Sequence, residues 1–143
     1  MALVKATNAT SRGIRCRLSA ARRELPRVHD FRKLLVWQLA RELGADVYKL
    51  CRGRPRDELV VTSQLRRAAF AIATSIAEGC GKSSRPEVIR YLDISAGSAA
   101  ETEHHLVTWL DIGGIDGRKC DELLARVASI RRMLYALIRN LPE

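Results

Sequence analysis

A run of acidic and imidazole side chains, ETEHH at 101–105, is the cluster in this sequence whose residue types could bind a metal. Glu101 and His104 stand three residues apart, which is the Glu-x-x-His spacing of di-iron helix bundles, and Glu101 and His105 also share one helix face. A di-iron centre needs a second such pair and two more carboxylates, but the remaining histidine, His29, has no glutamate three residues before it. We therefore expect no metal and no cofactor, and a structural or solvated role for these side chains.

The neighbouring Glu103 falls on the apolar side of the same predicted helix, between Ala99 and Leu106. A carboxylate that leaves water is stable there only with a cationic or hydrogen-bonding partner. We expect Glu103 to form a buried or interfacial ion pair with an arginine, and Arg66 is the candidate partner.

Catalytic motifs are missing from the sequence. It has no recognisable nucleophile and base, no glycine-rich phosphate loop and no paired-carboxylate motif. The four cysteines contain no C-x-x-C pair, so neither a zinc site nor a disulfide framework is indicated. We therefore predict a protein without enzymatic activity. We also predict that all four cysteines are reduced and dispensable for folding: Cys16, Cys51, Cys80 and Cys120.

Positive charge is concentrated near the N-terminus: nine of the 25 Lys and Arg residues, but two of the 16 Asp and Glu residues, lie within residues 1–33. Residues 1–28 lack a sustained apolar period, so we expect a disordered basic tail there. Three roles stay open for it: a phosphate-binding arm, a mitochondrial transit peptide, or an inert or mis-started extension. As an arm it would bind RNA or DNA through Arg12, Arg15, Arg17, Arg22 and Arg23.

The remaining residues, 29–143, are expected to form one all-α domain. Their apolar side chains are mostly Leu, Ala, Ile and Val, which fill helical bundles better than pleated sheets. No apolar run approaches the roughly 18 residues needed to span a bilayer. We therefore expect no membrane partner and a cytoplasmic location.

Apolar periodicity predicts four helices, near 34–52, 58–78, 84–112 and 116–140, separated by short breakers. Short connections force sequential helices to run antiparallel, so we predict an up-down-up-down four-helix bundle. Ser84 and Glu87 have the spacing of a capping box, and Asp116 can cap the last helix. The glycines of GCGKSS, 79–84, suit left-handed caps that would end the second helix.

The second predicted helix is apolar on two sides. Leu65, Ala69 and Ile72 belong to one stripe, whereas Phe70, Ala73 and Ala77 form another beside it. A four-helix bundle buries one face of each helix, so a second protein surface is expected to cover the other stripe. The alternative is that an alanine-rich helix tolerates water.

The third predicted helix repeats this pattern, because Tyr91 and Trp109 fall outside its main stripe. It also contains the small-residue run SAGSAA, 95–100, where Gly97 would destabilise the helix unless another helix approaches closely. Both helices together predict an obligate oligomer with an interface that includes Phe70, Ala73, Ala77, Tyr91 and Trp109.

A second group of basic residues surrounds the same two helices. We expect phosphate contacts at Arg66 and Arg67, and at Lys82, Arg85 and Arg90 around the turn that follows. The alternative for these five residues is a solvated surface with salt bridges between subunits.

Several blocks of the sequence resemble a family of small bacterial four-helix-bundle proteins that are encoded in intervening sequences of 23S ribosomal RNA genes. The resemblance covers about 31–141, and it is most specific at TSQLRRAA followed by IAEG. The resemblance implies homopentameric rings with no established enzyme activity, and it implies that a neighbouring subunit covers the second stripe of helix two. A related branch, the accessory proteins of diversity-generating retroelements, works with a reverse transcriptase and nucleic acid.

Two departures from that family pattern change these expectations. The family often reads Ile-Pro-Ser-Asn in helix two, but this chain has IATS at 72–75, so we expect no proline kink. Asp93 stands where a basic residue is common, so a strongly basic outer wall is not expected.

The function favoured by the sequence is a non-catalytic homo-oligomeric module, most simply a pentamer, that binds nucleic acid or a nucleic-acid enzyme. The alternative is a purely structural homo-oligomer without nucleic acid.

Overall fold

The computed structural model describes residues 30–142, and these residues contain four α-helices and no strand. The helices are α1 (Leu35–Cys51), α2 (Leu59–Cys80), α3 (Arg85–Asp111) and α4 (Gly117–Arg139). Two short 3-10 helices precede α1 and α2: η1 (Phe31–Lys33) and η2 (Arg56–Glu58). The all-α prediction is confirmed, whereas the predicted tail at 1–28 lies outside the described residues.

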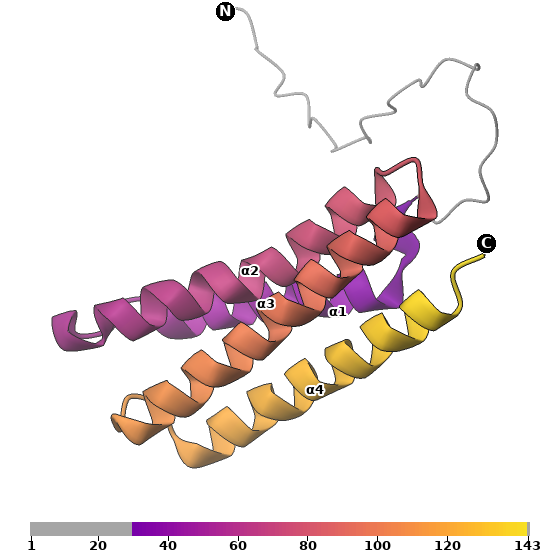
Figure 1. The fold of residues 1–143 in the computed structure, drawn as a ribbon. Helices are drawn as coiled ribbons and strands as arrows, with labels where there is room; N and C mark the ends of the chain where they lie inside the picture. Colours follow the sequence, from indigo (N-terminus) through magenta and orange to yellow (C-terminus); the bar gives the residue numbers. More distant parts are fainter. Residues whose placement is uncertain (1–29, 143) are drawn as a thin grey trace, which may run out of the picture.

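The four helices lie side by side, and each runs antiparallel to the next (Figure 1). α2 packs against both α1 and α3, and α4 packs against α3 and more loosely against α1. This is the predicted up-down-up-down bundle. None of the helices within residues 30–142 is both long enough and apolar enough to cross a membrane.

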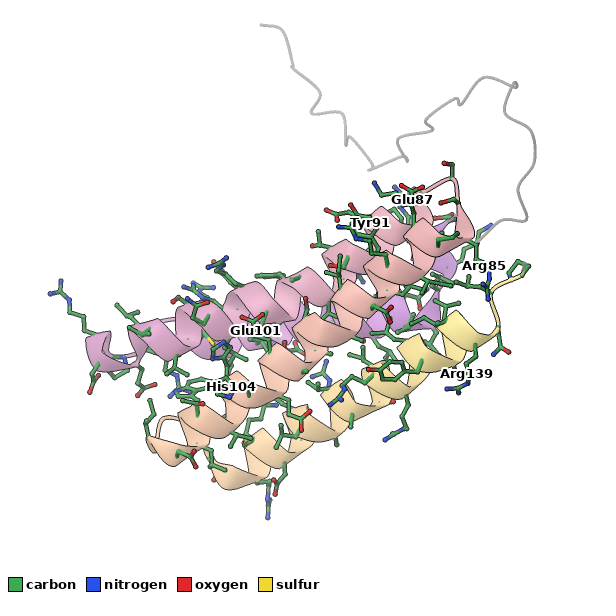
Figure 2. The ribbon with its side chains drawn as sticks, in the orientation of Figure 1. Arg85, Glu87, Tyr91, Glu101, His104 and Arg139 are labelled. Carbon is green, nitrogen blue, oxygen red and sulfur yellow. The ribbon has the colours of Figure 1, made fainter. Side chains whose placement is uncertain are left out.

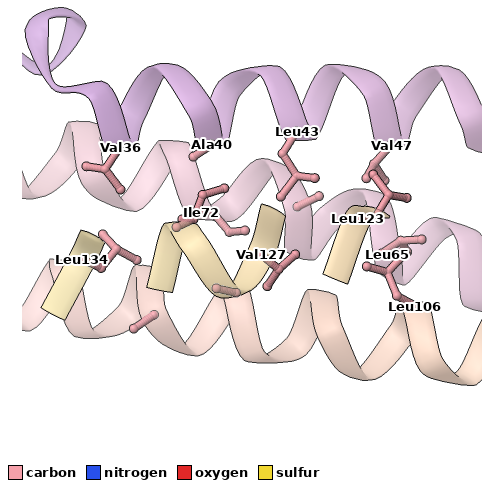
Figure 3. Close-up of a cluster of buried hydrophobic side chains, with 14 of the residues drawn as sticks. Val36, Ala40, Leu43, Val47, Leu65, Ile72, Leu106, Leu123, Val127 and Leu134 are labelled. Carbon is pink, nitrogen blue, oxygen red and sulfur yellow. The ribbon is translucent and has the colours of Figure 1, made fainter. Parts of the chain in front are cut away.

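The core contains one buried stripe from each helix, which Figure 3 shows between α1 and its neighbours. Burying a Leu or Ile side chain contributes roughly 1.5–3 kcal/mol, so these stripes are the main source of stability. On α4 the buried stripe follows helical steps of three and four residues, at Cys120, Leu123, Val127, Ile130 and Leu134.

The most extensive contact between helices joins α2 to α3. The buried hydroxyl of Ser95 donates a hydrogen bond of 2.8 Å to the backbone carbonyl of Ile72. Nearby, a Cβ atom added to Gly79 would lie 3.0 Å from the Cβ atom of Tyr91. Small residues therefore bring α2 and α3 together, but Gly97 is not one of them, since a Cβ atom added there would have no neighbour within 4 Å.

The helix ends confirm one predicted cap and correct two others. The Asp116 carboxylate accepts a hydrogen bond of 3.1 Å from the backbone N–H of Lys119, as predicted. The Ser84 hydroxyl instead donates a hydrogen bond of 2.8 Å to the Glu87 carboxylate. The two side chains therefore bond each other rather than the backbone N–H groups, and no capping box forms. The left-handed glycines predicted after helix two are wrong: α2 continues through Cys80, and Gly81 has a φ of −85°.

Trp109 is fully buried, so its predicted place in an oligomer interface is wrong. Its indole Nε1–H donates a hydrogen bond of 2.8 Å to the Glu58 carboxylate, which supplies the polar partner that burial requires. The Arg54 guanidinium lies 4.9 Å from the centre of the Trp109 ring and donates to the Gly114 carbonyl at 3.1 Å. This network ties the α1–α2 turn to the α3–α4 turn.

Three buried cysteines lie in the described part of the chain, all as free thiols: Cys51, Cys80 and Cys120. Burial raises the pKa of Cys51 to about 11, although the positive charges of Arg66 and Arg54 oppose the shift. Burial also raises the pKa of Cys80 and of Cys120. Thiols with raised pKa values are poor nucleophiles near neutral pH.

We predict that Gly114→Ala destabilises the bundle, because a Cβ atom at this position would overlap the Trp109 indole. Overpacking of this kind costs about 1–3 kcal/mol. Urea unfolding should show the loss, whereas Gly117→Ala, where a Cβ atom would meet nothing within 4 Å, should not. Equal stability of the two variants would contradict the role of the Trp109 network.

We also predict that stability falls at alkaline pH through Cys51. Its folded pKa of about 11 lies above the ordinary 9.0, so the fold favours the neutral thiol. The resulting stabilisation is complete below pH 9.0 and is lost as the pH rises through about 11. Urea unfolding at a series of pH values should show a smaller alkaline loss for Cys51→Ala, and parallel curves would refute this origin.

A candidate assembly surface between α1 and α2

An open apolar groove of about 660 Å³ runs between α1 and α2 on the outside of the bundle. Its floor consists of alanines from both helices, and aromatic side chains stand at its ends. The residues that line it are Phe31, Trp37, Ala40, Arg41, Ala45, Phe70, Ala73, Thr74, Ala77 and Glu78.

Aromatic pairs stand near both ends of the groove, and Tyr48 belongs to one of them without lining the groove itself. At one end, the Phe31 ring from η1 lies 4.9 Å from the Trp37 ring, measured between centroids. At the other end, the centroids of Tyr48 and Phe70 lie 6.1 Å apart. Phe70 lies over Gly44, where a Cβ atom would come within 3.1 Å of the ring. The Phe70 side chain therefore stays on the outside, 46% exposed.

Charged side chains lie at the edges of the groove rather than on its floor. The Arg41 guanidinium lies 5.4 Å from the Trp37 ring centroid, and Arg66 lies 5.9 Å from that of Tyr48. Glu78 is the carboxylate among the lining residues. An apolar centre with aromatic and arginine side chains around it is the usual composition of a protein–protein interface.

The residues predicted for an oligomer interface divide between three places. Phe70, Ala73 and Ala77 gather in this groove, as one stripe of α2. Tyr91 lies elsewhere, half-buried against α2 with the Lys82 amino group 4.7 Å from its ring centroid. Trp109 belongs to the core.

The sequence reasoning missed the half of the groove that α1 contributes. Trp37 and Arg41 stand four residues apart on one helix face, and Ala45 follows at the same spacing. That spacing was the available signal, because these residues lie beside the buried stripe of α1 rather than within it.

The predicted phosphate-binding residues also fall into separate groups. Arg12, Arg15, Arg17, Arg22 and Arg23 lie outside the described residues. Arg66 and Arg67 lie on α2 away from its ends, whereas Lys82, Arg85 and Arg90 surround the α2–α3 turn. Figure 2 shows Arg85 and Arg139 at this same end of the bundle, where η1 adds two further cations, Arg32 and Lys33.

The acidic and imidazole side chains at 101–105 lie along α3. Within residues 30–142, no group of three or more metal-binding side chains converges. Glu101 lies 3.5 Å from the His105 imidazole, and the rings of His104 and His105 are 5.0 Å apart. Figure 2 places Glu101 and His104 well along α3 from its Arg85 end.

Glu103 forms an ion pair, but its partner differs from the predicted one. The Arg131 guanidinium donates to the Glu103 carboxylate at 2.7 Å, which joins α3 to α4. Arg66 is therefore not its partner, because Glu103 faces α4 whereas Arg66 lies on the α1 side of α2 beside Tyr48.

Comparison with known proteins places this arrangement in a family. No curated protein sequence matches the chain. A solved structure from Bacteroides thetaiotaomicron, described as a protein of unknown function from the S23 ribosomal protein family, has the same fold with a TM-score of 0.69 and 23% identity. The similarity covers 74% of this chain and 100% of that one. The family model for the 23S rRNA-intervening sequence protein matches residues 32–136. Because this match includes nearly the whole bundle, the chain belongs to the 23S rRNA-intervening sequence protein family.

Proposed function

We propose that the protein is a non-catalytic self-assembling module and that a second copy of the chain covers the groove between α1 and α2. The observation that carries this proposal is the apolar floor of the groove, which lies at the surface with the half-exposed Phe70 ring beside it. Apolar surface removed from water contributes roughly 25 cal/mol per Å², so covering this groove favours association.

The groove covers only part of the surface that a stable contact needs, and the helices beside it extend further. α1 has 17 residues and α2 has 22, and a helix rises about 1.5 Å per residue, so the two helices offer a long surface. A stable interface buries about 800 Å² on each partner. A helix from a second copy, laid along the groove, is the kind of ligand that this shape accepts.

The lack of catalytic chemistry in the groove supports the same reading. Its lining residues include one carboxylate, Glu78, and neither histidine nor cysteine. An open groove without a nucleophile or an acid–base pair suits binding rather than catalysis. The resemblance to ring-forming family members supports five copies as the assembled state.

We predict that Ala73→Glu disperses the assembly, because a carboxylate on the groove floor would lose its water without gaining a partner. Light scattering after size exclusion should give about five times 16.0 kDa for the wild type and a much smaller mass for the variant. Ala125→Glu, at an exposed position of α4, is the matched control and should assemble normally. A wild type that is monomeric at micromolar concentration would refute self-assembly.

A second activity, polyanion binding, is favoured by the cations at one end of the bundle. Lys82, Arg85 and Arg90 surround the α2–α3 turn, Arg139 ends α4, and η1, the first described element, lies at the same end. A ring whose copies point the same way would bring several such ends together, which raises the effective concentration of the cations. We propose RNA or DNA, alone or with a nucleic-acid enzyme, as the partner of this end.

We predict that binding of a single-stranded oligonucleotide is non-specific and weakens steeply with salt, because phosphate contacts release counterions. Fluorescence anisotropy should show that deletion of residues 1–28 removes most of the affinity at low salt and flattens the salt dependence. The double variant Arg85→Ala/Arg139→Ala should weaken binding further without changing the assembled mass. Equal affinities before and after deletion would remove the N-terminal segment from the site, and no binding by any form would favour a purely structural assembly.

A further inference from the structure

We propose that the surface which fills the groove is the outward face of α3 in the next copy, with Ile94 on the groove floor and Glu101 beside Arg66. The inference depends on the self-assembly proposed above and specifies which two surfaces meet. It makes the contact heterologous, since each copy offers its groove to one neighbour and its α3 to the other.

The charges of the two surfaces are complementary. From Tyr91 to Asp111, α3 contains four acidic residues and no Lys or Arg, in a chain of net charge +9. Glu103 is neutralised by Arg131 within the chain, whereas the remaining acids of this stretch are exposed at Asp93, Glu101 and Asp111.

Cations lie along the other of the two proposed contact surfaces, on the groove side of α1 and α2. Arg41 and Arg67 are exposed, and Arg66 is half-buried at the end of the groove near Tyr48. Arg66 takes part in none of the salt bridges formed among residues 30–142. An acidic helix laid into this groove would supply the missing carboxylate.

The outward face of α3 has the shape of a ligand for the groove. Ile94 is 44% exposed, so it presents an apolar side chain outside the core. One turn further along, Gly97 lies in open space, and neither a turn nor a packing contact within residues 30–142 requires a glycine there. Glycine destabilises a helix interior relative to alanine, and a helix surface without a Cβ atom lets a second helix approach closely.

The register of α3 against α2 brings the residues that are proposed to meet to the same position along the bundle axis. The hydrogen bond from Ser95 to Ile72 fixes α3 against α2, and antiparallel helices rise equally per residue. Ile94 is therefore level with Ala73, and Glu101 is level with Arg66. In a ring whose axis runs along the helices, every copy has the same height, so Ile94 of one copy reaches Ala73 of the next and Glu101 reaches Arg66.

The positions of the helices allow such contacts to close into a ring. α3 borders α2 but lies diagonally across the bundle from α1, which packs on α2 and α4 (Figure 1). The groove and the outward face of α3 are thus neither the same surface nor opposite surfaces. A heterologous contact between such surfaces turns each copy by a constant angle and closes when the angle divides a full circle.

Disulfide trapping tests the pairing directly. A chain with Ala73→Cys is co-expressed with a chain carrying Ile94→Cys, and the assembly is oxidised and run on a non-reducing gel. We expect a crosslinked dimer from the mixture and none from either variant alone. Replacing the second chain by Ala125→Cys, on the exposed side of α4, gives the matched control and should yield no crosslink.

The other outcomes separate this inference from self-assembly itself. A crosslink formed by Ala73→Cys alone would mean that grooves face each other, and it would overturn the heterologous pairing. An assembly of unchanged mass without any crosslink would also overturn it, while self-assembly would stand. A monomeric wild type would remove both proposals.

A charge exchange tests the ion pair independently of cysteine chemistry. Arg66→Glu and Glu101→Arg should each weaken assembly, roughly tenfold in the concentration for half-assembly, since each places like charges opposite one another. The double variant Arg66→Glu/Glu101→Arg should recover most of the loss. Asp121→Arg, exposed on α4, is the control for a simple change of net charge. Failure of the double variant to recover would overturn the pairing of Arg66 with Glu101.

Discussion

The close packing of α2 against α3 is the constraint on which the other features depend. A hydroxyl of α3 reaches a backbone carbonyl of α2, from Ser95 to Ile72, and Gly79 leaves room for Tyr91. Such short contacts fix both the distance and the register of the two helices. The α3 side of α2 is thereby filled by small residues, so the aromatic side chain of α2, Phe70, lies on the other side, towards α1.

Between α1 and α2, alanines lie where larger side chains would fill the space. Ala40, Ala73 and Ala77 leave a groove, and the Trp37 and Phe70 rings border it instead of closing it. A leucine at one of these positions would fill part of the groove within a single copy. The small residues thus lie where a second protein surface can enter the groove. If that surface belongs to a second copy, the stability of the fold depends on the concentration of the chain.

The features that the sequence predicted are those that depend on neighbours within a few residues. The two stripes of α2 follow from helical periodicity, and the Asp116 cap follows from a side chain that accepts a hydrogen bond at the start of a helix. Two helix-end predictions failed locally, at Ser84 and Gly81, whereas the errors about the core and the ion pairs concern partners that are distant in sequence. The burial of Trp109 depends on Glu58, which is 51 residues away, and Glu103 pairs with Arg131, 28 residues away.

The half of the groove from α1 was missed for a related reason. Trp37 and Arg41 look like a solvated helix face until α2 is placed beside them, because their significance comes from the surface that two helices build together. Periodicity reports which residues of one helix leave water, but it does not report which faces of two helices meet. The structure supplies this missing relation through the Gly44–Phe70 contact.

Charge is segregated along the bundle in a way that links the two proposed activities. The exposed acids of α3, including Glu101, would repel a polyanion from the middle of an isolated chain, whereas the cations near Arg85 would attract it to one end. If each α3 lies in a neighbour's groove, Arg66 and the nearby arginines neutralise that acidic surface. Assembly would then remove the repulsion between the acids of α3 and a polyanion, and it would leave the basic ends grouped on one side of the ring. Nucleic acid affinity would therefore depend on assembly through electrostatics as well as through the number of binding ends.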